Sequence, residues 1–206
     1  MKKVFLFILL LSLLPVLPGC GKAEPGVTYP EPESVPCTLR AETLTDQDAR
    51  ELGRDPALSS CAAFSFQLES PAESCKFLLY RLENGVWEDI AGGSWIPMTE
   101  DSGTLLLQFE DLGQEARITL RSGSGLLPVS LSPGMTVPGN RASGFLASVT
   151  EAQWGQQIPL AVQAVSPQDR VPVPDPEIWE EPEAWANLGY EEVFLLTVSF
   201  RPPEAS

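Results

Sequence analysis

Residues 75–90 read CKFLLYRLENGVWEDI, and this stretch decides how the chain folds. Two runs rich in apolar and aromatic side chains flank the pair Asn84-Gly85, where the chain can reverse its direction. An Asn-Gly pair in this position is a strong signal for a type I′ hairpin turn, because both central residues of that turn need a positive φ. The sequence therefore predicts an antiparallel β-hairpin over residues 75–90.

Segments with the same β character recur on both sides of this hairpin. Residues 63–68 read AFSFQL, in which apolar and polar side chains alternate. This period of two is typical of a strand with one buried face. Further strands are predicted at residues 38–44, 104–110, 115–121, 129–131, 158–165 and 193–200. Such a series of short strands indicates an all-β fold, an antiparallel two-layer β-sandwich of immunoglobulin-like or jelly-roll order.

Three segments depart from this pattern of strands. A short helix is predicted at residues 46–52, because Thr45 and Asp48 have the spacing of a capping box. Residues 121–144 are rich in Gly, Ser and Pro, and residues 166–190 combine several prolines with acidic side chains. Loops of this length are uncommon in compact domains and are often functional. These two segments are therefore predicted to carry the functional site.

The amino terminus has the pattern of an export signal. Lys2 and Lys3 precede an apolar run over residues 4–17, which is shorter than the roughly 20 residues of a membrane-spanning helix. The run ends in Leu17-Pro18-Gly19-Cys20. This ending resembles the lipobox of bacterial lipoproteins, in which the cysteine receives a diacylglycerol group and becomes the new amino terminus. Leu17, Gly19 and Cys20 match that pattern, and Pro18 departs from it.

The resemblance implies a domain organisation and a location. Residues 1–19 would be a signal peptide, and residues 20–36 would be a lipidated tether whose spaced prolines favour an extended chain. Residues 37–206 would form a single β-sandwich domain. The lipid on Cys20 would anchor this domain to the bacterial cell membrane, on the extracytoplasmic side.

Composition excludes several classes of function. The chain has 206 residues, with 13 Lys and Arg against 28 Asp and Glu and a formal net charge of −15. We expect no nucleic-acid partner, because nucleic-acid binding needs a basic surface that neutralises phosphates. The chain has no histidine, which excludes Ser-His-Asp and Cys-His catalysis and His-ligated zinc. We expect no cofactor.

These observations favour a non-catalytic module that binds a protein or glycan ligand. Two alternatives stay open. The first is an extracellular hydrolase that acts on glycans with two carboxylates, although 28 acidic residues leave no particular pair singled out. The second is a structural accessory subunit of a cell-envelope complex, which would present an apolar patch to its partner.

The acidic segment is a candidate metal site, because calcium takes about six to eight oxygen ligands and carboxylates supply them. The alternative is a solvated acidic loop. The candidate ligands are Asp169, Asp175, Glu177, Glu180 and Glu181, with Glu183 beside them.

Four tryptophans are predicted to lie in connections between strands, where an exposed indole can stack on the face of a sugar. The alternative is burial against the core, which is commoner for tryptophans in loops. Trp87 is expected to pack within the hairpin. The candidate ligand-binding residues are Trp95, Trp154, Trp179 and Trp185.

Three cysteines remain for the domain once Cys20 carries the lipid. Outside the cytosol, Cys37, Cys61 and Cys75 can form at most one internal disulfide. All three pairings stay open, and a bridge that involves Cys37 is favoured. The alternative is three reduced thiols that pack as small apolar groups.

Overall fold

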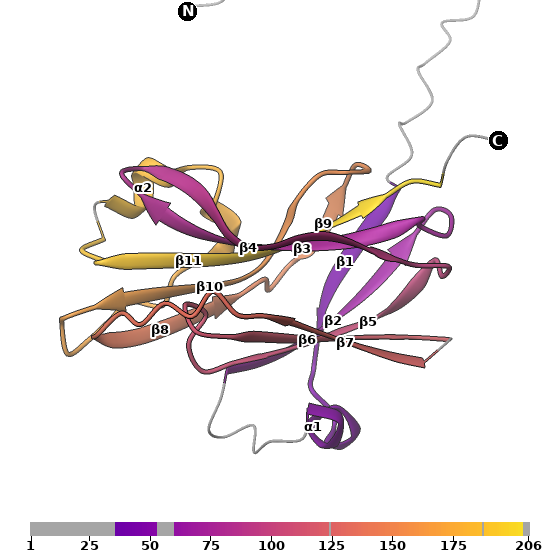
Figure 1. Cartoon of the computed structure of the whole chain (residues 1–206), viewed down its shortest axis with the longest axis horizontal. Helices are drawn as coiled ribbons and strands as arrows, with labels where there is room; N and C mark the ends of the chain where they lie inside the picture. The colour runs from indigo at the N-terminus through magenta and orange to yellow at the C-terminus, as the bar shows by residue number, and fades with distance from the viewer. Residues whose placement is uncertain (1–35, 53–59, 124, 187, 204–206) are drawn as a thin grey trace, which may run out of the picture. The chain divides into compact units, whose positions relative to one another are not determined.

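The computed structural model describes residues 36–52, 60–123, 125–186 and 188–203. Within these residues, eleven antiparallel strands form two sheets that pack face to face (Figure 1). Sheet A has the strand order β7-β6-β5-β2-β1-β9, and sheet B has the order β4-β3-β11-β10-β8. The predicted all-β antiparallel sandwich is confirmed.

The elements have the following bounds. Sheet A contains β1 (Cys37–Glu42), β2 (Ser60–Leu68), β5 (Ser102–Phe109), β6 (Ala116–Ser122), β7 (Gly125–Leu131) and β9 (Val149–Ala152). Sheet B contains β3 (Ser74–Glu83), β4 (Val86–Pro97), β8 (Asn140–Phe145), β10 (Ile158–Ser166) and β11 (Glu192–Arg201). The helical elements are α1 (Asp46–Leu52), the 3-10 helix η2 (Pro176–Ile178) and α2 (Pro182–Ala186).

The hairpin predicted from residues 75–90 is present as β3 and β4. Glu83 pairs with Val86 across the turn, and φ is 52° at Asn84 and 78° at Gly85, as a type I′ turn requires. β4 continues to Pro97, beyond the predicted end of the strand at residue 90. This longer strand becomes one border of the candidate site described below.

Residues 121–144 differ from the expected long loop. They contain all of β7, of which only residues 129–131 were predicted as a strand, and most of β8, which was not predicted. The strand β9 at Val149–Ala152 was not predicted either. Each of these three strands lies at the edge of a sheet. Edge strands tolerate Gly, Ser and Pro, because only one side of the strand has to form ladder hydrogen bonds. Their composition therefore resembles that of a loop.

The main core lies between the two sheets. The alternation predicted in β2 is present, since Phe64, Phe66 and Leu68 are all buried in this core. The ring centroids of Phe66 in sheet A and Phe200 in sheet B are 5.3 Å apart. This contact ties the two layers together at one end of the sandwich.

The helix α1 lies against the outer face of sheet A (Figure 1). It begins with the predicted capping box: the Asp48 carboxylate accepts hydrogen bonds from the backbone N–H and the hydroxyl of Thr45, at 2.8 and 2.7 Å. Arg121 of β6 donates a further hydrogen bond to Asp48 at 2.7 Å. Burial alone would raise the pKa of Asp48, but these three donors outweigh it and hold the pKa below its ordinary value. Asp48 therefore stays ionised and fixes α1 to sheet A.

A second core covers the outer face of sheet B. It is built by residues 167–186, which we call the strap, and its centre is Trp185, which is 1% exposed. Trp185 packs on Val193 and Leu195 of β11 and meets Trp87 of β4 edge-on, with ring centroids 6.2 Å apart. The strap therefore packs against sheet B and is not a free loop.

The strap also crosses the outer face of β8, the edge strand of sheet B. The backbone of Pro174 lies so close to Gly144 of β8 that a β-carbon on Gly144 would overlap the Pro174 carbonyl oxygen. On the same side of the molecule, β9 is the edge of sheet A and is only four residues long. We call this side, formed by β8 and β9, the closed edge.

The predicted signal peptide at residues 1–19, the lipidation site Cys20 and all but the last residue of the tether predicted at residues 20–36 lie outside the described residues. In the part of the chain that the structure describes, no helix is long and apolar enough to cross a membrane. These three predictions therefore remain predictions.

Candidate binding groove

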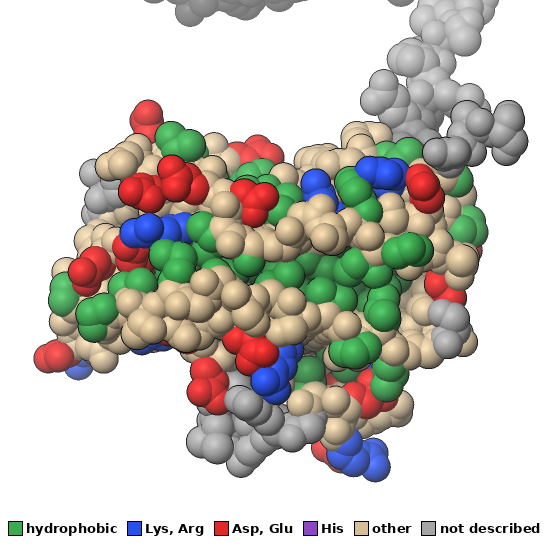
Figure 2. Space-filling view, in the orientation of Figure 1, with side chains coloured by type: hydrophobic (Ala, Val, Ile, Leu, Met, Phe, Trp, Pro, Cys, Tyr) green, Lys and Arg blue, Asp and Glu red, His purple; other side chains and the backbone are tan. Residues whose placement is uncertain are grey.

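A groove lined by apolar side chains opens between the two sheets at the side opposite the closed edge. Its borders are β4, the edge strand of sheet B, and β7, the edge strand of sheet A. Figure 2 shows it as a band of hydrophobic side chains between the two layers. We call this side, formed by β4 and β7, the open edge.

The middle of the groove is a cavity of about 400 Å³. Phe77 of β3 forms its floor, Ala91 and Ile96 line it from β4, and Val129 and Leu131 line it from β7. Phe77 and Leu131 belong to the main core, and Ala91, Ile96 and Val129 are only partly buried against it. The groove is thus the part of the core that the two sheets leave accessible.

The sequence of β4 widens the groove at Gly92 and Gly93. Both residues have a positive φ, 99° and 89°, and the register with β3 shifts here, as in a β-bulge. A β-carbon on Gly92 would overlap the carbonyl oxygen of Phe77, so only glycine fits. Gly92 and Gly93 both line the cavity, so the bulge forms part of its border.

The groove continues past the end of β4 as a second cavity of about 250 Å³. Met98 and Leu120 are buried at its base, and Leu126 and Leu127 of β7 lie at its rim. The two rim leucines are 54% and 40% exposed, which makes them two of the few large apolar side chains that the described residues leave in solvent. Exposed leucines beside a continuous apolar groove are typical of a binding surface.

Two acidic residues of β4, Glu88 and Asp89, are exposed. Figure 2 shows acidic side chains, together with some basic ones, along the apolar band. The whole chain carries a formal charge of −15. A basic ligand would therefore be attracted to this side of the molecule.

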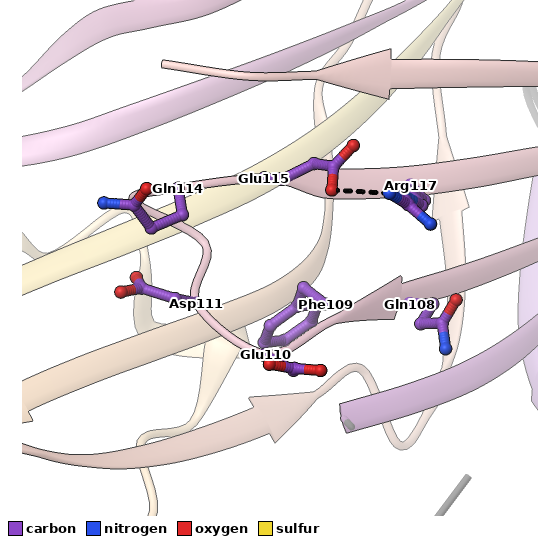
Figure 3. Close-up of a pocket in the computed structure, with 7 residues that line it drawn as sticks. All are labelled: Gln108, Phe109, Glu110, Asp111, Gln114, Glu115 and Arg117. Atoms are coloured by element: carbon purple, nitrogen blue, oxygen red, sulfur yellow. Dashed lines mark ion pairs between the residues drawn. The ribbon is translucent and has the colours of Figure 1, made fainter. Parts of the chain in front are cut away.

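A further pocket lies at the turn between β5 and β6, where the side chains of Glu110, Asp111, Glu115 and Arg117 gather (Figure 3). Its volume is about 160 Å³. Glu115 forms an ion pair with Arg117 at 2.9 Å, and Asp111 forms one with Arg141 of β8. These charges stabilise the turn and its neighbours, so we do not place the functional site here.

The predicted calcium ligands are not brought together. Within the described residues, no three side chains of His, Cys, Asp or Glu are arranged to hold a metal ion. Asp175 instead caps η2, where its carboxylate accepts a hydrogen bond from the backbone N–H of Glu177 at 2.9 Å. The remaining candidate carboxylates are spread along the exposed surface of the strap: Asp169, Glu177, Glu180 and Glu181.

The predicted exposure of the four tryptophans is wrong for Trp185, which is buried in the second core and donates its indole N–H to the carbonyl of Ile178 at 3.3 Å. Trp179 packs on the same core, and Trp154 packs on the main core. Trp95 lies in β4 and not in a connection, because β4 is longer than predicted. The groove contains none of these four residues.

No disulfide joins the three cysteines among the described residues. Cys37 in β1 and Cys75 in β3 are buried in the main core, and burial raises their pKa values to about 11 and about 12. Cys61 stands at an odd position of β2, whereas Phe64 and Phe66 at even positions face the core. Cys61 therefore points to the other face of sheet A, away from Cys37 and Cys75.

Comparisons with protein-family models, with curated protein sequences and with solved structures found no match for this chain. The function is therefore argued from the geometry of the domain.

The groove was not predicted from the sequence, although two signals for it are present. Gly92-Gly93 inside a run of strand residues is typical of a bulge or a close backbone approach. Leu126 and Leu127 are two adjacent large apolar residues in a segment that is otherwise rich in Gly and Ser, which is a second signal of an apolar surface. Both signals identify a site only once β4 and β7 are known to face each other.

Proposed function

We propose that the protein is a lipid-anchored extracytoplasmic binding module whose groove at the open edge holds an extended polypeptide segment with basic residues. The observation that carries this proposal is the groove itself, an accessible part of the core between two edge strands. The module acts by binding and carries out no chemistry on its partner.

An extended polypeptide fits this groove better than a compact ligand. β4 has a free edge, and an added strand would form main-chain hydrogen bonds with it, as in other cases of β-strand addition. Alternate side chains of that added strand would point into the groove, toward Ile96 and Val129. Pro128 lacks an N–H group, so β7 offers a poorer edge and contributes mainly apolar contacts.

The acidic residues of the domain favour extended polypeptide ligands that carry positive charge. Glu88 and Asp89 lie on the strand that would receive the added strand, and the chain as a whole is strongly acidic. A segment in which basic and apolar residues alternate would satisfy both the acidic surroundings and the apolar groove.

The groove is tested by binding of two short synthetic peptides, one with alternating Lys and Val and one with alternating Glu and Val. We expect the Lys-Val peptide to bind and the Glu-Val peptide not to bind. The double variant Leu126→Ser, Leu127→Ser should weaken binding about tenfold or more, because it removes apolar contact area at the rim.

The matched control is the double variant Val173→Ser, Leu188→Ser. These residues are 74% and 42% exposed but lie outside the groove. Binding by this control should equal that of the unmodified protein. Equal affinity for both peptides, or an equal loss in both double variants, would contradict the proposed site.

The anchor is supported by the lipobox pattern at Leu17-Pro18-Gly19-Cys20 and is tested separately. In bacteria that express the full chain, the protein should incorporate labelled palmitate and fractionate with the membrane. The variant Cys20→Ala should lose the label and leave the membrane fraction. Unchanged retention of Cys20→Ala would contradict the anchor and leave the groove proposal standing.

A further inference from the structure

Two cations and one indole form a cluster on the outer face of sheet B, away from the groove. The Lys76 ammonium lies 4.8 Å from the ring centroid of Trp95, and the Arg201 guanidinium lies 4.1 Å from it. The three residues come from adjacent parts of β3, β4 and β11, where Lys76 pairs with Trp95 and with Ser199. Such cation–π contacts hold the charged groups in place and leave N–H donors free at the edge of the ring.

Lys76 and Arg201 are two of several described cations without an ion pair, since Arg40, Arg50 and Arg170 also form none. What distinguishes Lys76 and Arg201 is that both lie over the same aromatic ring. Arg81, Arg117, Arg121 and Arg141 each form an ion pair with a carboxylate. Lys76 and Arg201 form none with any carboxylate of the described residues. The chain has 28 acidic residues that could pair with these two cations, yet both cations contact an indole instead. This arrangement is consistent with a binding site for an external anion.

A buried hydroxyl lies in the same cluster. Ser74 pairs directly with Arg201 in the register and stands two residues before Lys76, so all three side chains share one face of sheet B. Ser74 is 5% exposed, and its hydroxyl makes no hydrogen bond with any described residue. A buried polar group without a partner is destabilising, and an anion bound beside Arg201 would supply the missing acceptor.

We propose that Lys76, Arg201 and Ser74, arranged around Trp95, form a binding site for a phosphate group. A phosphate has enough oxygens to accept hydrogen bonds from a guanidinium, an ammonium and a hydroxyl at once, and it balances two positive charges. The site differs from the groove in the sign of its charge and in the chemistry of its ligand.

The position of the cluster suggests two sources for the phosphate. The backbone N–H of Glu69 bonds to the carbonyl of Pro36, and that of Glu73 bonds to the carbonyl of Arg201. The cluster therefore lies at the end of the domain where the chain enters from its amino terminus. A phospholipid headgroup and a soluble phosphate offer the same chemistry at this place, and the experiment distinguishes them.

The test measures tryptophan fluorescence of the full chain in an uncharged detergent during titration with inorganic phosphate, with ionic strength held constant by sodium chloride. We expect a saturable change that is absent in Trp95→Phe. Lys76→Gln and Arg201→Gln should each weaken the apparent affinity about tenfold, the loss typical of one charge-assisted hydrogen bond. Circular dichroism checks that each variant is folded.

The matched control is the double variant Arg40→Gln, Arg170→Gln, which changes the net charge by the same amount as Lys76→Gln, Arg201→Gln but at two exposed positions outside the cluster. The control should bind phosphate like the unmodified protein. An equal loss in both double variants would show a general charge effect and overturn the proposal.

In the second arm, the full chain is reconstituted into vesicles without added phosphate. A Trp95-dependent change in vesicles of phosphatidylglycerol, and not in vesicles of phosphatidylcholine, would support the site and identify the headgroup as its ligand. A response to inorganic phosphate alone would support the site with a soluble ligand. No saturable response in either arm would overturn the proposal, and none of these results depends on the groove.

Discussion

The two long edges of this sandwich end in different ways. At the closed edge, the strap lies across β8, and β9 has only four residues. At the open edge, β4 and β7 have twelve and seven residues, and no other described strand lies beside them. Proteins usually cover or shorten the edges of their sheets, because a free edge pairs readily with other chains. This difference supports the proposal that the open edge binds a ligand.

Three features of the open edge nevertheless limit non-specific pairing of other chains with β4 and β7. The bulge at Gly92 and Gly93 divides β4, and Pro128 removes a backbone donor from β7. Glu88 and Asp89 add charge that repels another acidic copy of the same chain. A partner must therefore match a short length of strand, an apolar groove and an acidic border.

The strongest test of the comparison removes the centre of the strap. Trp185→Ala should lower the free energy of unfolding by about 3–5 kcal/mol, because a fully buried indole is lost. The matched variant Trp95→Ala, on the outer face of the same sheet, sheet B, should cost clearly less, because Trp95 is only partly buried. Urea denaturation measures both values, and equal losses would contradict the role of Trp185 as the centre of the second core.

A smaller effect is expected where the strap crosses β8. Gly144→Val should destabilise the protein by about 1–3 kcal/mol, because its side chain would push the Pro174 backbone away from the strand. Gly123→Ala is the control, since a β-carbon at Gly123 meets no described atom within 4 Å. Thermal melts should show a lower midpoint for the first variant alone. A tendency of Gly144→Val to self-associate would further show that the strap protects this edge.

The comparison extends to the outer face of sheet A, where α1 is fixed by Asp48. Asp48→Asn should lower the unfolding free energy by about 1–2 kcal/mol at neutral pH, because the asparagine loses charge-assisted hydrogen bonds from Thr45 and Arg121. The folded pKa of Asp48 is lowered, so its contribution is present above the ordinary carboxyl pKa and is lost as the pH falls through the folded value.

The gap in stability between the unmodified protein and Asp48→Asn should therefore narrow as the pH is lowered below about 4. The control is Asp46→Asn on the same helix, because Asp46 is exposed and should show a smaller effect. A gap that stays constant with pH would contradict the role of the Asp48 charge.

The smallest effect on stability is expected at the open edge. The double variant Leu126→Ser, Leu127→Ser should change the unfolding free energy by less than about 1 kcal/mol, since both side chains are largely exposed. Urea denaturation of this variant should thus nearly overlay that of the unmodified protein. A large loss would mean that these leucines serve the fold and not a ligand.

Much of the fold could be predicted from local sequence signals. Asn84-Gly85 fixed the position of the hairpin, the alternation in residues 63–68 identified β2, and Thr45 with Asp48 marked the start of α1. These signals are local, because a turn, an alternating strand and a capping box each depend on residues close together in the chain. The edge strands β8 and β9 and the first part of β7, before residue 129, could not be predicted, because their composition is that of loops.

The candidate groove could not be predicted, because it depends on which strands lie at the edges. Phe77 and Val129 line the same cavity but stand far apart in sequence, in different sheets. Residues 166–190 were instead predicted to be functional because tryptophans and acidic residues are frequent in that segment. Their tryptophans serve the second core, which the sequence could not reveal, since the burial of Trp185 depends on β11 being its neighbour.

The place of β11 at the centre of sheet B sets the order in which the protein can assemble. β11 pairs with β3 on one side and with β10 on the other, so sheet B remains two separate strand groups until β11 joins them. Of the strands that the structure describes, β11 is the last to be synthesised. The two strand groups of sheet B cannot pair with each other before this ten-residue strand is made, so a chain cut before Glu192 would leave the core between the sheets partly exposed.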